Sequence, residues 1–209
     1  MERNASIANG VVMILAAGLA SRLGGRSKPD LIWEGCETLL HHQVRLTIEA
    51  GFQPLVVSRV PRPELWSVVN ASPEKGIAGS LKAGLASIRE QRGDVPVGVL
   101  LADQPFVTVD DIRVVWRAFM ERPPGIHAVR PRYGSIPGHP VFFDAAWDPV
   151  VASLMGDRGI GAVWQQRDDV CLVSRDVVGR PSPSFDIDTV SNYHQALKWA
   201  RTEGDGDEI

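Results

Sequence analysis

Cysteine is scarce in this chain, whose 209 residues include only Cys36 and Cys171. Two cysteines cannot make a disulfide framework, and this pair lacks the close spacing of a metal-binding motif. We therefore expect two buried thiols in a reducing compartment, and hence a cytoplasmic protein.

Long apolar runs and an excess of positive charge are also missing. The apolar stretch Val11–Ala17 is too short to span a bilayer, and Met1–Asn9 lacks the basic-then-apolar layout of a signal peptide. The formal net charge is −3 and the pI is near 5.9, whereas general nucleic-acid binders are usually basic. We expect neither a membrane partner nor a nucleic-acid partner.

The overall composition is that of a globular protein, with 44% hydrophobic and 22% charged residues. The chain is long enough for one domain with a substantial core, and no repeat or linker divides it. We predict a single domain over residues 1–209, with a core from about 10 to 201 and a frayed acidic tail at 202–209.

Apolar runs of strand length alternate with segments of helix length. The predicted strands are Val11–Ala16, Pro54–Ser58, Trp66–Asn70, Val97–Ala102, His127–Pro131, Val141–Phe143, Val170–Ser174 and Ser184–Ile187. The predicted helices are Thr38–Ala50, Ala78–Gln91, Val109–Arg122, Ala145–Met155, Gly159–Arg167 and Val190–Arg201. This alternation predicts an α/β fold with a mostly parallel sheet, whose ligands bind beyond the carboxyl ends of the strands.

A glycine-rich loop follows the first strand and carries Arg22, Gly24-Gly25 and Lys28. Glycines let the backbone approach phosphates, and the two cations can neutralise them. The loop lacks the Gly-Lys-Ser/Thr of a P-loop and the G-x-G-x-x-G of a dinucleotide site. A turn with surface cations is the alternative, but the spacing favours a polyphosphate site.

The segment LAAGLASRLGGRSK resembles the loop of the MobA-like NTP transferases, which attach CMP or GMP to molybdopterin. The resemblance extends from about Val11 to about Ala196. It implies a three-layer α/β/α sandwich with a Rossmann-like, mixed, mainly parallel sheet, the nucleotide-diphospho-sugar transferase fold. It also implies nucleotide contacts, which in the first loop come from Leu15, Ala16, Ala17, Gly18, Arg22 and Lys28, with catalytic roles for the last two.

Two details of this loop refine the resemblance. Ala16-Ala17-Gly18 is similar to the cytidylyl-transferring members, whereas guanylyl-transferring members tend to carry Gly-Gly. Pro29 departs from the apolar residue that usually follows the lysine, and it disfavours helical backbone at Lys28.

The middle of the chain contains Asn70, Gly76 and Gly79-Ser80. Ser80 could simply cap the helix that begins there. The pattern is similar to the family's N…G-x-x-x-S-L segment, which contacts base and ribose. This resemblance implies that Asn70, Gly79 and Ser80 bind the nucleotide.

Asp103 directly follows the apolar strand VGVLLA. An aspartate at this edge of a parallel sheet either caps the next segment or holds a metal. Thr108 and Asp111 already offer a capping box for the next helix, which leaves Asp103 free. Ala102-Asp103-Gln104-Pro105 resembles the family's G-D-Q-P, whose aspartate coordinates Mg²⁺; Asp103 is therefore also a catalytic candidate.

Phe185-Asp186-Ile187-Asp188-Thr189 provides two further acids. Along a strand, Asp186 and Asp188 would share one face, where a cation would relieve their repulsion. In the alternative, Asp188 caps the last helix, a role that Thr189 could share. The segment resembles the family's D-I-D-T-P, and we predict that Asp103, Asp186 and Asp188 bind Mg²⁺.

The loop PRYGSIPGHPV resembles the family's P-x-Y-x-G-x-x-G-[HN]-P-V segment on the acceptor side. It implies acceptor contacts from Tyr133, Gly138 and His139, joined by Gln104. His139 could instead bond to backbone. Asp157 lies in a G-D-x-G segment and could be a cap of the following helix.

The resemblance implies a Mg²⁺-dependent nucleotidyltransferase that moves CMP from CTP, or another NTP, onto a phosphorylated acceptor and releases pyrophosphate. The implied acceptor is molybdopterin loaded with molybdenum. Three alternatives stay open: a guanylyltransferase with another phosphorylated acceptor, an NAD(P)H-dependent oxidoreductase, and a carrier that hands the cofactor to a molybdenum-hydroxylase client.

Overall fold

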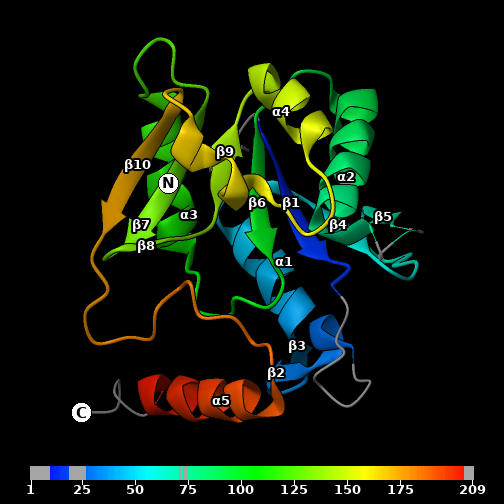
Figure 1. Cartoon of the computed structure of the whole chain (residues 1–209). Helices are drawn as coiled ribbons and strands as arrows, with labels where there is room; N and C mark the ends of the chain where they lie inside the picture. The colour runs from blue at the N-terminus through cyan, green and yellow to red at the C-terminus, as the bar shows by residue number, and fades with distance from the viewer. Residues whose placement is uncertain (1–9, 19–26, 71, 73–74, 205–209) are drawn as a thin grey trace, which may run out of the picture.

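The computed structural model describes residues 10–18, 27–70, 72 and 75–204. Within these ranges, no helix combines the length and the apolar composition needed to cross a bilayer. A central sheet of eight strands runs through this part of the chain in the order β10-β7-β9-β6-β1-β4-β5, and β8 pairs with β7 (Figure 1). Its strands are β1 (Val11–Ala16), β4 (Gln53–Ser58), β5 (Ser67–Val69), β6 (Val97–Leu101), β7 (Ala128–Tyr133), β8 (Ile136–Pro137), β9 (Val141–Phe143) and β10 (Val170–Arg175).

The sheet is mixed and mainly parallel, as the sequence predicts. The parallel pairs join β1 to β4 and β6, β4 to β5, and β7 to β10. Strand β9 runs antiparallel to both β6 and β7. Every residue of β1 is buried, as expected for a central strand covered on both faces.

Helices cover both faces of the sheet and complete the three layers (Figure 1). They are α1 (Leu39–Glu49), α2 (Gly76–Arg92), α3 (Val109–Met120), α4 (Asp148–Ser153) and α5 (Val190–Gly204). Apolar residues of α2 and α4 pack on one face, and those of α1 and α3 pack on the other. Helix α5 instead lies against a small hairpin, β2 (Ile32–Glu34) and β3 (Glu37–Thr38), around Trp33, Phe106 and Ile187.

Two element predictions are wrong, and a third, the helix Ala145–Met155, is confirmed only over α4. Ser184–Ile187 forms no strand; it crosses the end of the sheet, where the Ile187 amide donates to the Asp103 carbonyl at 3.0 Å. The predicted helix Gly159–Arg167 is two 3₁₀ turns, Ile160–Ala162 and Trp164–Gln166, because Gly159 and Gly161 weaken helix formation. The predicted helix Ala145–Met155 is a 3₁₀ turn, Ala145–Trp147, followed by the short α4.

The prediction of two buried thiols is also wrong. Cys36 is exposed and Cys171 is partly exposed. Cys36 stands in the tight turn between β2 and β3. The hairpin itself and β8 were not predicted, because each strand is too short to show a period.

Candidate active site

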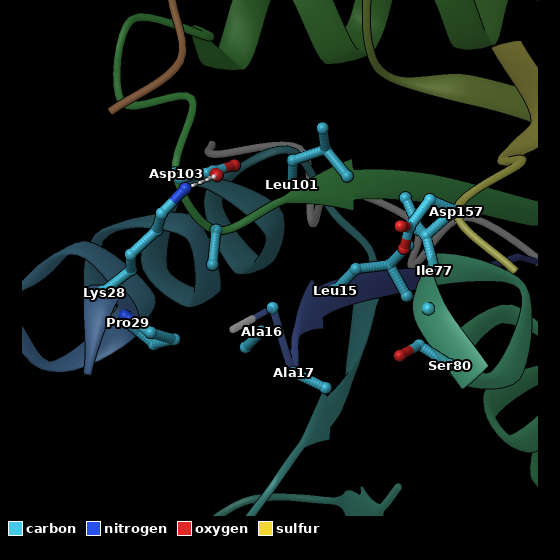
Figure 2. Close-up of a pocket in the computed structure, with 13 residues that line it drawn as sticks. Leu15, Ala16, Ala17, Lys28, Pro29, Ile77, Ser80, Leu101, Asp103 and Asp157 are labelled. Atoms are coloured by element: carbon cyan, nitrogen blue, oxygen red, sulfur yellow. Dashed lines mark hydrogen bonds and ion pairs between the residues drawn. The ribbon is translucent and has the colours of Figure 1, made fainter. Parts of the chain in front are cut away.

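The carboxyl ends of β1 and β6 lie side by side and open onto a pocket of about 340 Å³. Thirteen residues line it: Leu15, Ala16, Ala17, Gly18, Lys28, Pro29, Gly76, Ile77, Ser80, Leu101, Ala102, Asp103 and Asp157. Figure 2 shows Lys28 and Asp103 on one side and Ile77, Ser80 and Asp157 on the other, with Leu15–Ala17 between them. Six of the predicted nucleotide contacts therefore share one cavity with Asp103.

Asn70 and Ser80 hold each other beside this pocket. Asn70 Nδ2 donates to Ser80 Oγ at 3.0 Å, and both residues are buried. Because α2 begins at Gly76, Ser80 lies in its second turn, so the capping alternative for Ser80 is wrong. A Cβ on Gly79 would lie 3.1 Å from Lys75 Cβ and 3.5 Å from Asn70 Nδ2, so Gly79 lies next to Asn70 but is not required for its packing.

Gly76 and Asp157 form a second wall that sequence reasoning did not assign to the site. Gly76 has φ +66°, and a Cβ there would clash with the Asp157 carboxylate and the Gly156 backbone. The Gly156 carbonyl accepts from the Ala78 amide at 3.1 Å. The capping prediction for Asp157 is wrong, because no side chain caps the 3₁₀ turn at Ile160–Ala162. The G-D-x-G segment was the signal that could have placed Asp157 here.

Lys28 reaches two of the predicted metal ligands. Its Nζ lies 3.1 Å from Asp103 Oδ2 and 2.6 Å from Asp188 Oδ1. Burial lowers the pKa of Lys28, but the two carboxylates outweigh burial and raise the pKa above its usual value. Lys28 opens a short 3₁₀ helix with Pro29, so the prediction that the proline keeps Lys28 out of helical backbone is wrong. Arg22, the other predicted phosphate ligand, lies outside the described residues.

Thr residues cap both helices that follow the predicted metal ligands. Thr108 and Asp111 make the predicted capping box at the start of α3. At α5, Thr189 Oγ1 accepts from the Asn192 amide at 3.1 Å. Thr189 thus caps α5, and the alternative in which Asp188 does so is wrong. Both Asp103 and Asp188 are left free to face Lys28.

Asp186 belongs to the same carboxylate group through Gln104. Gln104 Nε2 donates to Asp186 Oδ1 at 2.8 Å. Partial burial of its carboxyl group raises the pKa of Asp186 to about 6, although other atoms of the residue are exposed. The charges of Asp103 and Asp188 raise this pKa further, whereas the hydrogen bond from Gln104 lowers it. Asp186 does not share a strand face with Asp188, because this segment is not a strand.

The described residues include no set of three or more acidic, histidine or cysteine side chains close enough to hold a metal ion. However, Asp103 and Asp188 already face one cation, the Lys28 ammonium. Mg²⁺ commonly uses only one or two protein carboxylates and fills its shell with water and substrate phosphates. This pair of oxygen donors fits that mode of binding.

On the acceptor side, His139 Nδ1 lies 3.1 Å from Gln104 Oε1. Because Gln104 Nε2 donates to Asp186, Oε1 must accept, which places the proton of His139 on Nδ1. Burial, with the charge of Arg130, lowers the pKa of His139 to about 3, so its ring is neutral. The ring of His139 thus bonds to the side chain of Gln104, and not to backbone as the alternative has it.

Tyr133 and Gly138 support His139. The Tyr133 hydroxyl donates to the His139 carbonyl at 3.0 Å, and burial raises the pKa of this phenol. A Cβ on Gly138 would lie 2.5 Å from Tyr133 Cε2. Neither residue lines the 340 Å³ pocket, nor does His139.

One buried carboxylate anchors the segment that carries Asp186 and Asp188. Asp111 is fully buried and accepts hydrogen bonds from Arg175 Nε at 3.1 Å and Arg180 Nη2 at 3.0 Å. Arg180 Nη1 also donates to the Phe106 carbonyl at 2.9 Å. These bonds join the chain around residue 180 to the start of α3, next to Asp103. Sequence reasoning gave Asp111 only a capping role.

Comparisons with known proteins place the chain in one family. The sequence profile of the MobA-like NTP transferase domain matches residues 12–170. A protein of Opitutus terrae described as a "probable molybdenum cofactor guanylyltransferase" is 31% identical in an alignment of length 169, which covers 76% of this chain and 74% of that protein. The family match and this relative together define the chain as a nucleotidyltransferase.

Solved structures show the same fold. Rv0371c from Mycobacterium tuberculosis H37Rv superposes with a TM-score of 0.72 and 24% identity, over 90% of this chain and 97% of that one. Molybdopterin-guanine dinucleotide biosynthesis protein A from Archaeoglobus fulgidus gives a TM-score of 0.66 and 16% identity, over 92% and 99%. The predicted nucleotide-diphospho-sugar transferase fold is confirmed, and the chain belongs to the MobA-like NTP transferase family.

Proposed function

We propose that this nucleotidyltransferase moves CMP from CTP onto molybdopterin loaded with molybdenum, with Mg²⁺ as its metal. The observation that carries the proposal is the position of Lys28 between Asp103 and Asp188. Lys28 and Asp103 line the same pocket as Ala16 and Ala17. A cation and two carboxylates at the edge of a parallel sheet suit the handling of a nucleoside triphosphate and its metal.

In the proposed reaction, a terminal phosphate oxygen of the acceptor attacks the α-phosphorus of CTP. A new P–O bond forms as the bond to the leaving pyrophosphate breaks. Phosphoryl transfer needs little acid–base chemistry from the protein, so positioning and charge supply most of the acceleration. Lys28 and Arg22 hold the triphosphate, and the neutral ring of His139, fixed by Gln104, orients the acceptor.

Asp103 and Asp188 would hold the metal, and Asp186 would support the site through its bond to Gln104. When bound, Mg²⁺ offsets the negative charge that develops on the transferring phosphates. The affinity of the site for the metal then depends on the release of Lys28 from the two carboxylates.

The choice of CTP follows from Ala17. The residue lines the pocket, and in our proposal the base lies against it, where its methyl group would reduce the room for a purine. A pyrimidine is smaller than a purine, and the Ala16-Ala17-Gly18 resemblance favours the same base. GTP is the second candidate, because the Opitutus terrae relative is described as a guanylyltransferase.

Replacing Asp103 by Asn tests the mechanism against the carrier alternative, in which the protein only hands the cofactor to a molybdenum hydroxylase. We expect pyrophosphate release to fall by at least about a hundredfold, because a charged ligand in the reaction centre is lost. Binding of molybdopterin, measured by fluorescence, should persist. Asp94→Asn, an exposed residue before the opposite end of β6, is the matched control. Equal activity of Asp103→Asn and the control would contradict the proposal.

A further inference from the structure

Asp157 lines the candidate active site, and the proposed function leaves it without a role. Figure 2 shows its carboxylate on the α2 side of the pocket, opposite Lys28 and Asp103. The residue is exposed, and its carboxylate has no hydrogen-bond or ion-pair partner within the described part of the chain. An ionised carboxylate only accepts hydrogen bonds, so the part of a substrate that lies against it must present a donor.

Backbone contacts, rather than side-chain bonds, set the position of Asp157. The Gly156 carbonyl accepts from the Ala78 amide at 3.1 Å, which joins this segment to the first turn of α2. Gly76 has φ +66°, and a Cβ built on it would clash with the Asp157 carboxylate. The glycine at the start of α2 thus leaves the space that the carboxylate occupies at the pocket wall.

The polar groups of the pocket differ between its two sides. Lys28 bonds to Asp103 on one side, where we expect the triphosphate and its metal. On the other side, the lining residues that the structure describes contribute two polar side chains, those of Ser80 and Asp157. Ser80 Oγ already accepts from Asn70. Because like charges repel, the Asp157 carboxylate disfavours the phosphates, and the nucleoside must lie on its side.

A bound CTP offers two kinds of donor to this carboxylate, the ribose hydroxyls and the amino group of the base. Under the proposed function the base lies against Ala17, and the ribose joins it to the triphosphate beside Lys28. The 2′- and 3′-hydroxyls are adjacent on the sugar, so two donors can face the two oxygens of one carboxylate. Dinucleotide-binding folds also place an acidic residue on the ribose. The ribose is therefore the better match.

We propose that Asp157 binds the ribose hydroxyls of the nucleotide and so makes the enzyme select ribonucleotides over 2′-deoxyribonucleotides. The inference rests on the proposed function for the position of the triphosphate. It does not depend on the choice of base, because CTP and GTP carry the same ribose. In the competing account Asp157 is structural, since a negative charge at the N-terminus of α2 is favourable and α2 has no side-chain cap.

Nucleotide binding without an acceptor tests the ribose contact in the full chain. Isothermal titration calorimetry in the presence of Mg²⁺ gives the Kd of CTP and of 2′-deoxy-CTP. The wild type should bind CTP at least about tenfold more tightly, because the deoxynucleotide lacks a donor to a charged acceptor. In Asp157→Ala, the Kd of CTP should rise roughly 10- to 100-fold and that of 2′-deoxy-CTP much less, so the two values approach each other.

Asp168→Ala provides the control, since it removes an exposed carboxylate outside the pocket. Its two Kd values should equal those of the wild type. Equal weakening of CTP and 2′-deoxy-CTP in Asp157→Ala would overturn the inference, because a structural carboxylate, or one that binds the base, does not sense the 2′-hydroxyl. Unchanged Kd values in that variant would overturn it as well.

The transfer reaction separates this inference from the proposed function. With loaded molybdopterin, the kcat/KM of Asp157→Ala should fall at least about tenfold for CTP and little for 2′-deoxy-CTP. Active transfer that keeps the wild-type preference for CTP over 2′-deoxy-CTP would refute the ribose contact and leave the function standing. If the wild type transfers nothing to molybdopterin, the proposed function fails, and the two Kd values still decide on Asp157. GTP and 2′-deoxy-GTP replace the cytidine pair if the protein binds GTP more tightly.

Discussion

The ammonium of Lys28 lies 2.6 Å from Asp188 Oδ1, although 160 positions separate the two residues in the sequence. This contact joins the loop after β1 to the segment before α5. Lys28 also lies 3.1 Å from Asp103, so one cation stands between two carboxylates at the pocket mouth. Under our proposal, this is where Mg²⁺ and the triphosphate of CTP would meet the protein.

Lys28→Met should slow nucleotidyl transfer by about 10²- to 10³-fold, as removal of a preorganised charge donor does elsewhere. At the same time, the nucleotide-free variant should bind Mn²⁺ more tightly, because the ammonium no longer repels the metal. Turnover and Mn²⁺ titration by electron paramagnetic resonance measure the two effects. Lys82→Met, on the exposed side of α2, is the control. Weaker Mn²⁺ binding would mean instead that Lys28 only holds the carboxylates in place.

Ala17→Gly should shift nucleotide preference from CTP towards GTP. Removing one methyl group from a substrate pocket changes discrimination by about tenfold or more. The ratio of kcat/KM for the two nucleotides measures the shift. Ala50→Gly, at the C-terminus of α1 and outside the pocket, controls for the general effect of an added glycine. An unchanged ratio would remove the physical basis for our choice of CTP.

His139 should make the protein sensitive to mild acid. Its pKa of about 3 in the folded state is far below the usual value of 6.5, so folding favours the neutral ring. Above about pH 6.5 the neutral ring does not lower the free energy of unfolding, because the unfolded chain is also neutral there. As the pH falls below 6.5, the unfolded chain binds a proton that the folded protein does not, and the free energy of unfolding decreases by up to about 2 kcal/mol at pH 5.

Urea unfolding of His139→Asn at pH 7 and pH 5 checks this dependence, because Asn keeps a donor to Gln104 but does not titrate. The variant should lose less stability than the wild type between the two pH values. His194→Asn, an exposed residue of α5, is the control. Identical losses in wild type and His139→Asn would show that His139 is not buried in its neutral form.

Asp111→Ala should destabilise the fold by about 3–5 kcal/mol, because it leaves two arginines near the start of α3 without their buried partner. Asp110→Ala should cost less than about 1 kcal/mol, since the Asp110 side chain is 72% exposed and its pair with Arg175 lies at the surface. Urea unfolding compares the two. Similar losses in both variants would show that Asp111 does not anchor the segment around residue 180.

The order of layers was predictable from the sequence because the central strands are long and apolar on both faces. The runs VVMILA and VGVLL could form little else between helix-length segments. Ser184–Ile187 failed because its alternating pattern only mimics a strand. Pro181 and Pro183 come just before it, and Ile187 is buried against Trp33 and Phe106 rather than in the sheet.

The site was predictable only one residue at a time. Local motifs brought attention to Lys28, Asp103 and Asp188, but nothing in the sequence could show that Lys28 pairs with both carboxylates. Asp157 packs against Gly76, which is distant in sequence, so its local G-D-x-G segment alone could not distinguish a cap from a pocket residue.

The most direct measurement is pyrophosphate release from CTP, GTP, ATP and UTP in the presence of Mg²⁺, with and without molybdopterin loaded with molybdate. We predict release from CTP that requires the loaded molybdopterin and is lost in Asp103→Asn. Release from GTP alone would refute the choice of base and keep the mechanism. Absence of release from every nucleotide with the loaded acceptor present would contradict the proposed transfer to molybdopterin.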